Sequence, residues 1–226
     1  MRNLACLVLL LALPGCDRKT PKPPVPEATT PTSDTLPYYT EKTFTARWLS
    51  REEADKEKPH TISDFAYTNQ DGKEITKDFL DGQIAVVNWF FTVCQGICPK
   101  IMGNVHETYD AFPQDSGIVF LSHSVTPKLD TPAVLRKYAD KREIKTLRWQ
   151  LVTGDREKIY AHARTNYFAD QEAGVREKNG IMHTENVILL DPEGHIRGVY
   201  NGTLRMDMKR LIADIRVLKK ELEATD

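Results

Sequence analysis

The sequence predicts an α/β fold in which a central mixed β-sheet is flanked by helices. Apolar, β-prone runs alternate with helical stretches along most of the chain, an order typical of βαβ units. The first of these runs, residues 84–91, is a continuous apolar stretch, as expected of a strand that is buried on both faces. The chain has 226 residues, of which 40% are hydrophobic, so it can bury the core of one ordinary domain.

A β-hairpin is predicted ahead of the first buried strand. Residues 62–67 alternate between apolar and polar side chains, residues 71–72 (Asp-Gly) supply a turn, and residues 74–76 resume the strand pattern. Further upstream, residues 50–58 form a run of mixed charge, which is expected to be a solvated surface loop or helical turn.

Buried strands and helices are then expected in alternation. The strands cover residues 84–91, 117–121 and 149–152, and the helices cover residues 99–112, a stretch that begins at 132, and residues 156–167. Pro99 and Pro132 suit the first turn of a helix, and Thr131 and Asp155 suit the N-cap position.

A second hairpin and a last helix are expected to close the domain. Residues 186–190 and 196–200 flank an Asp-Pro-Glu-Gly turn, and residues 204–222 carry apolar side chains on one helical face. This order matches a thioredoxin-like core with an extra N-terminal β-hairpin, in which the closing hairpin supplies an antiparallel edge. The tryptophans expected in or near the core are Trp48, Trp89 and Trp149.

The N-terminal residues have the pattern of a processing signal. Arg2 precedes an apolar run over residues 4–13, which is shorter than the roughly 20 residues that span a bilayer. The run ends at residues 13–16 (Leu-Pro-Gly-Cys), which resemble a bacterial lipobox. We therefore expect residues 1–16 to be a lipoprotein signal peptide with Cys16 lipidated, and a plain secreted protein is the alternative. Either way, the domain is expected to face the periplasm or another extracytoplasmic space.

The segment after the signal is expected to be a linker. Residues 17–37 are rich in proline, threonine, lysine and glutamate, a composition that cannot bury a core and favours an extended chain. The folded domain is expected over residues 38–226. The whole chain of 226 residues has a net charge of −1, which argues against a nucleic-acid-binding protein, because such proteins usually carry a basic excess.

Two cysteines remain in the folded part once Cys6 is removed and Cys16 is lipidated. Cys94 and Cys98 stand four residues apart, and in an oxidising compartment such a pair forms a disulfide, a metal site, or both in turn. A helix begins at this point, and its N-terminus stabilises thiolates, while Gly96 would let the loop fold back. Thiolates suit Cu(I), zinc or an iron–sulfur cluster. Two are too few for the usual cluster or closed zinc site, so a third ligand is expected.

His183 is the candidate for that third ligand. It ends a glycine- and charge-rich loop, residues 174–180, and comes just before the strand that opens the closing hairpin. In a thioredoxin-like topology this loop crosses over the cysteine loop, so His183 can face the pair. His123, at the end of a neighbouring strand, is a distant second candidate, and His195 is expected to be exposed in a hairpin turn.

Three motifs, in this order, resemble the SCO/SenC family of copper chaperones. They are F-F-T-x-C-x-x-x-C-P at 90–99, D-T-P at 130–132 and H-T-x-x-x-x-L-x-D-x-x-G at 183–194. The resemblance covers roughly residues 36–220 and implies a thioredoxin-like domain that binds Cu(I) and Cu(II) through Cys94, Cys98 and His183. It also implies a membrane-tethered metallochaperone. Such a protein delivers copper to the dinuclear centre of cytochrome c oxidase subunit II, or prepares the cysteines of that centre by redox chemistry.

The chain departs from the family pattern at Thr126, where many members carry an acidic residue. Asp130 then remains as the possible carboxylate outside the ligand set, with helix capping as the alternative role. Methionine sulfur is a further soft donor for copper, although methionine more often fills gaps in a core. The methionines concerned are Met102, Met182, Met206 and Met208.

Other functions would use the same cysteines. A thiol–disulfide oxidoreductase that cycles a Cys94–Cys98 disulfide is the main alternative, although such enzymes generally have two residues between their cysteines and this chain has three. A peroxidase would need a threonine and arginine pattern that is not present around Cys94. A purely structural Cys94–Cys98 disulfide would add little to the stability of the fold, because the loop that it closes is short. A copper sensor is a further alternative, and it would use the same ligands as a chaperone.

Overall fold

The computed structural model describes residues 35–169, 182 and 184–224. The strands are β1 (Tyr38–Tyr39), β2 (Ala46–Arg47), β3 (Ala66–Asn69), β4 (Glu74–Thr76), β5 (Ile84–Phe90), β6 (Ile118–Ser124), β7 (Trp149–Thr153), β8 (Asn186–Leu190) and β9 (Ile196–Asn201). The helices are α1 (Arg51–Glu57), α2 (Cys98–Asp110), α3 (Pro132–Lys141), α4 (Arg156–Asn166) and α5 (Arg205–Glu223), with a short 3-10 turn, η1 (Lys77–Phe79). Among the helices described, none is both long and apolar enough to cross a membrane.

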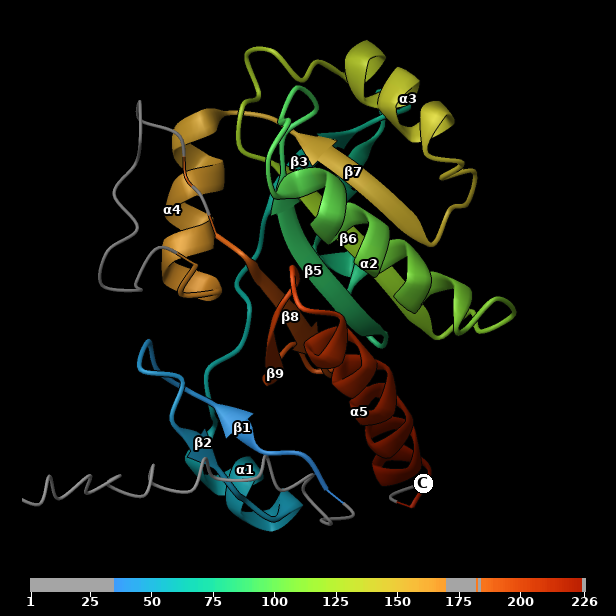
Figure 1. Ribbon diagram of the computed structural model, residues 1–226. Coiled ribbons are helices and arrows are strands. Elements are labelled where there is room, and N and C mark those ends of the chain that lie inside the picture. Colours follow the sequence, from blue (N-terminus) through green and yellow to red (C-terminus); the bar gives the residue numbers. More distant parts are fainter. Residues whose placement is uncertain (1–34, 170–181, 183, 225–226) are drawn as a thin grey trace, which may run out of the picture. The chain divides into compact units, whose positions relative to one another are not determined.

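A seven-stranded sheet, in the order β4-β3-β7-β6-β5-β8-β9, forms the centre of the domain (Figure 1). Its middle strands β5, β6 and β7 run parallel, whereas β3 pairs antiparallel with β7 and β8 pairs antiparallel with β5. Each edge is a hairpin, β3–β4 on one side and β8–β9 on the other. The predicted mixed sheet, with an N-terminal hairpin and an antiparallel closing edge, is therefore confirmed.

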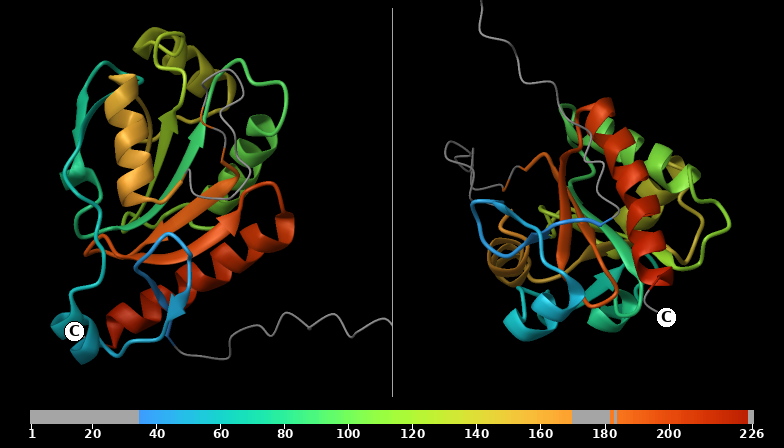
Figure 2. Two further views of the ribbon diagram at one scale, coloured as in Figure 1. Left: turned by 90° about the vertical axis from the view of Figure 1, so that its left-hand side faces the viewer. Right: turned by 90° about the horizontal axis from the view of Figure 1, so that it is seen from below.

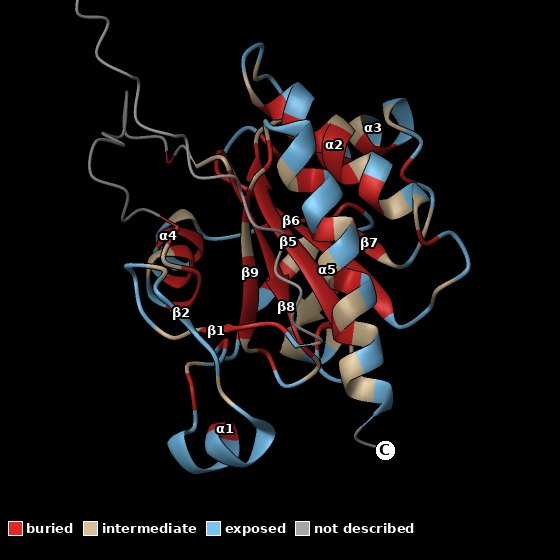
Figure 3. Cartoon of the chain, turned by 60° about the horizontal axis from the view of Figure 1, so that its bottom comes forward, coloured by how far each residue is buried: buried red, intermediate tan, exposed pale blue. Residues whose placement is uncertain are grey.

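Each face of the sheet has its own hydrophobic core, because successive residues of a strand point to opposite faces. Val86 and Phe90 of β5 belong to the core that also contains residues of α2, α3 and α5, whereas Val87 and Trp89 belong to the core that contains residues of α4. Figure 2 shows α4 on the face opposite α2 and α5, and Figure 3 shows that the strands between them are buried.

Strand β6 is longer than its apolar pattern predicts. It extends past residue 121 to Ser124, and all of its residues stay paired in parallel with β5. The added residues are polar but buried: Ser122 donates a hydrogen bond to Asn88 over 2.7 Å and accepts one from the indole of Trp149 over 3.0 Å. Internal hydrogen bonding thus compensates for the missing apolar pattern.

The N-terminal part of the domain holds more structure than the sequence pattern indicates. The buried Leu36 packs with the core, and β1 and β2 form a small pair of strands that was not expected. The charged run after them forms the short, mostly exposed helix α1, which agrees with the helical-turn alternative, and a capping box between Ser50 and Glu53 caps its N-terminus. Trp48, which follows the exposed strand β2, is 51% exposed, so its expected place in the core is wrong. The other two tryptophans are buried as predicted: Trp89 and Trp149.

Candidate metal centre

Cys94 and Cys98 lie at the carboxyl end of the central strand β5, where α2 begins. The chain turns after β5, and the Cys94 N–H donates to the carbonyl oxygen of Phe91 over 3.3 Å. Cys98 is the first residue of α2, and Pro99 follows at a position where a missing N–H costs no helical hydrogen bond. Cys94 is partly exposed and Cys98 is buried, so the pair has one open side.

The two thiols hydrogen bond to each other and have opposite pKa shifts. For Cys94, burial raises the pKa, but hydrogen bonds from the N–H and thiol of Cys98 and from the Gly96 and Ile97 N–H groups outweigh burial, so the net pKa is lowered. For Cys98, burial and the hydrogen bond to Cys94 raise the pKa to about 12. Cys94 is therefore the thiol of the pair that ionises more easily, because N–H groups at the start of a helix stabilise its thiolate form.

Gly96 contributes an N–H group rather than special backbone freedom. It is not among the glycines with positive φ, and a Cβ placed on it would lie 3.9 Å from Cys94 Sγ, which is ordinary van der Waals contact. The loop does fold back and bring the two sulfurs together, as expected, but the backbone at residue 96 does not use the conformational freedom of glycine.

Asp130 connects the cysteine loop to the end of β6. Its fully buried carboxylate accepts hydrogen bonds from both the N–H and the hydroxyl of Thr92, two residues before Cys94. It also accepts hydrogen bonds from the hydroxyls of Ser124 and Thr126, over 2.6 and 2.9 Å. One carboxylate thus joins the loop after β5 to the loop after β6, without contacting either thiol among its described hydrogen bonds.

This network bears on two expectations from the sequence: the role of Asp130, and the departure from the family pattern at Thr126. Thr131 is the N-cap of α3, and the described side-chain hydrogen bonds of Asp130 all go elsewhere, so helix capping by Asp130 is not supported. Thr126, the departure from the family pattern, supplies a hydroxyl donor to Asp130 instead of a second carboxylate. The sequence analysis did not identify Thr92 or Ser124. Thr92 lies within the first motif, which could have drawn attention to it, whereas Ser124 lies outside all three motifs.

His183 lies outside the described residues, but both of its chain neighbours are described. Met182 and Thr184 line a small cavity together with Cys98, Ile97 and four apolar residues from the ends of β5 and β6. Met182 is buried, and its N–H donates to the Tyr160 hydroxyl over 3.1 Å; that hydroxyl donates in turn to the Val125 carbonyl oxygen over 2.7 Å. The chain on either side of residue 183 is thus held against the cavity that Cys98 lines.

The other histidine candidates lie away from the cysteines. His123 is buried with its ring stacked on Trp89, in the core beneath α4, whereas Cys98 packs in the core on the opposite face. Burial, with a smaller contribution from His162, lowers the pKa of His123 to about 3, and its Nε2 has no partner among the described residues. His195 is only partly exposed, because its Nδ1 lies 3.1 Å from the Asp191 carboxylate, so its expected exposure is not confirmed.

The methionines are mostly accounted for by packing. Met102 is fully buried, and its sulfur accepts a hydrogen bond from Asn88 over 3.4 Å. Met208 is buried in the core beneath α5, and Met206 is 74% exposed at the start of that helix. Met182 alone among the four lines the cavity beside Cys98.

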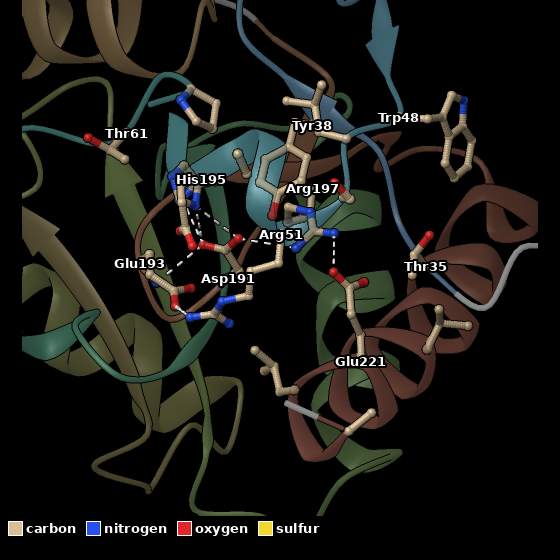
Figure 4. A pocket seen from close by; sticks show the side chains of 18 of the residues that line it. Thr35, Tyr38, Trp48, Arg51, Thr61, Asp191, Glu193, His195, Arg197 and Glu221 are labelled. Atoms are coloured by element: carbon tan, nitrogen blue, oxygen red, sulfur yellow. Dashed lines mark hydrogen bonds and ion pairs between the residues drawn. The ribbon is translucent and has the colours of Figure 1, made fainter. Parts of the chain in front are cut away.

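A second cluster of potential metal ligands lies at the opposite end of the sheet. The ligand atoms of Asp191, Glu193 and His195 are within 4.8 Å of one another, beside a cavity of about 1090 Å³ (Figure 4). However, the Asp191 carboxylate already pairs with the buried Arg197 over 3.2 Å, and Arg51 pairs with Glu193 over the same distance. A cation there would have to compete with two guanidinium groups, so we interpret this cluster as structural.

Arg197 is the centre of that structural cluster. Its guanidinium pairs with Glu221 of α5, donates to the carbonyl oxygens of residues 36 and 37, and lies 4.1 Å from the centroid of the Tyr38 ring. Since Leu190 at the end of β8 pairs with Ala85 at the start of β5, this cluster and the cysteines lie at opposite ends of the sheet. It fixes the first described residues onto β9 and α5.

Comparison with known proteins identifies the family. The family model described as SCO1/SenC matches residues 53–220. A SCO1/SenC family lipoprotein from Bacillus anthracis is 28% identical, with a TM-score of 0.62 over 71% of this chain and 95% of that chain. BsSco, described as a member of the Sco family of cytochrome c oxidase assembly proteins, is 24% identical, with a TM-score of 0.62 over 71% and 94%. Bradyrhizobium japonicum ScoI, solved with copper bound, is 23% identical, with a TM-score of 0.53 over 66% and 98%. Because the family model spans well over half of its length, this chain belongs to the SCO1/SenC family.

Proposed function

We propose that this protein is a copper-binding metallochaperone that holds one copper ion through Cys94, Cys98 and His183. The proposal rests on one arrangement: the thiols of Cys94 and Cys98 hydrogen bond to each other, and Cys98 lines the same cavity as the two chain neighbours of His183. Two thiolates and an imidazole form a soft-to-borderline donor set that suits copper. The copper bound to Bradyrhizobium japonicum ScoI, which shares the fold, supports this choice of metal.

The chain's own residues would perform loading and release. The thiol of Cys94 ionises more easily than that of Cys98, whose raised pKa retains its proton, so metal loading would release protons. The exposed side of Cys94 would give an incoming cysteine of another protein access to the copper, and this cysteine could displace the ligands one at a time. Oxidation of the two thiols to a disulfide, with two electrons passing to an oxidant, would remove both sulfur ligands, so loading would depend on the redox state.

The recipient in this proposal is the dinuclear copper centre of cytochrome c oxidase subunit II. The description of BsSco as a member of a family of cytochrome c oxidase assembly proteins supports the oxidase as the destination. Lipidation at Cys16, followed by the linker over residues 17–37, would tether the domain to the outer side of a membrane. The signal-like N-terminal pattern supports this part, as does the lipoprotein from Bacillus anthracis. Cys16 and most of the linker lie outside the described residues.

A thiol–disulfide oxidoreductase remains a second candidate, because the cysteines have unequal environments. A partly exposed cysteine with a lowered pKa beside a buried one with a raised pKa is the arrangement of an attacking and a resolving thiol. Such an activity could also reduce the cysteines of the copper recipient before metal transfer. Turnover of a disulfide substrate by the copper-free protein, with no copper retained after anaerobic loading, would favour this candidate over the chaperone.

The test is copper stoichiometry and the absorption spectrum of the reduced full chain after anaerobic loading. Cys94→Ala, Cys98→Ala and His183→Ala should each weaken copper binding sharply. His106→Ala is the matched control, because His106 lies on α2 and pairs only loosely with Asp110, at 3.7 Å. Wild-type copper retention by His183→Ala would remove the histidine from the site, and retention by either cysteine variant would refute the proposed ligand set.

A further inference from the structure

Two strongly exposed apolar side chains lie on the two loops that meet near Cys94. Val93 is 64% exposed in the loop after β5, and Leu129 is 59% exposed in the loop after β6. Each adjoins one member of the hydrogen-bonded pair formed by Thr92 and Asp130, so the two loops are fixed to each other. Exposed apolar side chains held rigidly beside a reactive group are more informative than scattered ones, because they mark surfaces that a partner covers.

The exposed charged side chains on the two segments that carry Val93 and Leu129, residues 91–100 and 125–131, are both lysines. Lys100 and Lys128 are exposed, and neither has an ion pair among the described residues. Within residues 91–100 and 125–131 the only acidic residue is Asp130, whose carboxylate is fully buried and bonded to hydroxyl and N–H donors. Among the described residues, the segments after β5 and β6 therefore combine exposed apolar side chains with exposed lysines and carry no exposed acidic side chain.

We propose that Val93, Leu129, Lys100 and Lys128 form a docking rim for a protein whose metal-binding surface is apolar and bordered by acidic residues. This inference rests on the proposed function, since it names the chemistry of the partner that exchanges copper with the same site. Transfer through a shared copper ion requires a ligand of the partner to approach Cys94 closely, so the surfaces around both sites must lose their water. An apolar centre lowers the cost of that step, and opposite charges at the margin steer the encounter.

A small thiol would not need this rim. A molecule such as dithiothreitol reaches the open side of Cys94 without covering Val93 or Leu129, and it carries no charge for the lysines to attract. The rim should therefore affect copper transfer to a protein but not copper removal by a small neutral thiol.

The experiment compares copper release from the loaded full chain to two acceptors: the soluble domain of cytochrome c oxidase subunit II, and dithiothreitol. Lys100→Glu combined with Lys128→Glu should slow transfer to the subunit II domain by roughly tenfold at low salt, with the difference shrinking as salt screens the charges. Leu129→Ser combined with Val93→Ser should slow the same transfer by about threefold or more at every salt concentration. Release to dithiothreitol should stay within about twofold of the wild type for both variants.

Matched controls come from the opposite end of the sheet. Leu147 is 79% exposed and Lys145 is exposed, and both precede β7 on the side away from the cysteines. Leu147→Ser and Lys145→Glu should leave both transfer rates unchanged. Equal rates for rim variants and controls would overturn the docking rim, as would an equal slowing of release to dithiothreitol, because the latter would place the defect in the copper site.

Failure of the proposed function would appear differently. If the wild-type chain retains no copper after anaerobic loading, the chaperone proposal fails before any rim variant is compared. If it loads copper but gives none to the subunit II domain, the assigned partner is wrong and the docking rim falls with it.

Discussion

Removing the carboxylate of Asp130 should destabilise the domain and loosen its cysteine loop. In Asp130→Ala the hydroxyls of Ser124 and Thr126, both on buried residues, lose their shared acceptor, as do the N–H and hydroxyl of Thr92. Each buried donor left without a partner costs about 1–3 kcal/mol, but hydroxyls can rotate toward new partners and Thr92 can reach water. Counting the two buried hydroxyls and allowing for this relaxation gives an expected loss of about 3 kcal/mol.

The assay is urea unfolding of the reduced, copper-free protein, followed by far-ultraviolet circular dichroism. Asp110→Ala is the matched control, because Asp110 is exposed at the end of α2 and its only described ion pair is the loose one with His106. The control should change the free energy of unfolding by less than about 0.5 kcal/mol. The Asp130 variant should also lose part of its copper loading, since Thr92 would no longer hold the approach to Cys94. An unfolding free energy within about 0.5 kcal/mol of the wild type would refute this reasoning.

Two further predictions follow from the pKa shifts. Iodoacetamide should modify Cys94 before Cys98 in the reduced, copper-free protein. The pKa of Cys94 is lowered and its side chain is partly exposed, whereas burial raises the pKa of Cys98 to about 12. Peptide mass mapping at short reaction times checks this order, and equal labelling of the two cysteines would contradict it. Burial lowers the pKa of His123 to about 3, so between pH 6.5 and pH 3 the unfolded chain binds a proton at this residue that the folded protein does not. As the pH is lowered through this range, the free energy of unfolding should therefore decrease by up to about 1.4 kcal/mol per pH unit for this group. His123→Phe should reduce this slope in urea titrations between pH 7 and 4, and an unchanged slope would show that His123 does not carry it.

The arrangement of the cysteines was predictable because it depends on local order. An apolar strand followed by a proline-marked helix places any residue between them at the carboxyl end of the sheet, and Cys94 and Cys98 lie there. The mixed sheet followed from the same alternation of elements, together with turns that need glycine, such as Gly72 and Gly194 at positive φ. The role of His183 rests on motif resemblance and on its two described neighbours.

The network around Asp130 was not predictable from the sequence in the same way. It joins Thr92 in the loop after β5, Ser124 at the end of β6 and Thr126 in the loop after β6. These residues carry no hydrophobic pattern, so only the folded chain shows that their donors meet at one carboxylate. The polar end of β6 was missed for a related reason, because its residues are buried through hydrogen bonds rather than through apolar character. Trp48 shows the converse error, since a large aromatic side chain need not be buried when it follows an exposed strand.

The position of the Arg197 cluster would have a mechanical consequence if the proposed lipid anchor at Cys16 holds the protein by its N-terminal end. The chain joins the domain at residues 36–38, which are fastened to β9 and α5 by a buried guanidinium, a carboxylate and an aromatic ring. A pull on the chain ahead of this point would be borne by those two elements. The strain would not pass through the loops at the other end of the sheet, so the geometry that presents Cys94 would be insulated from movements of the anchor.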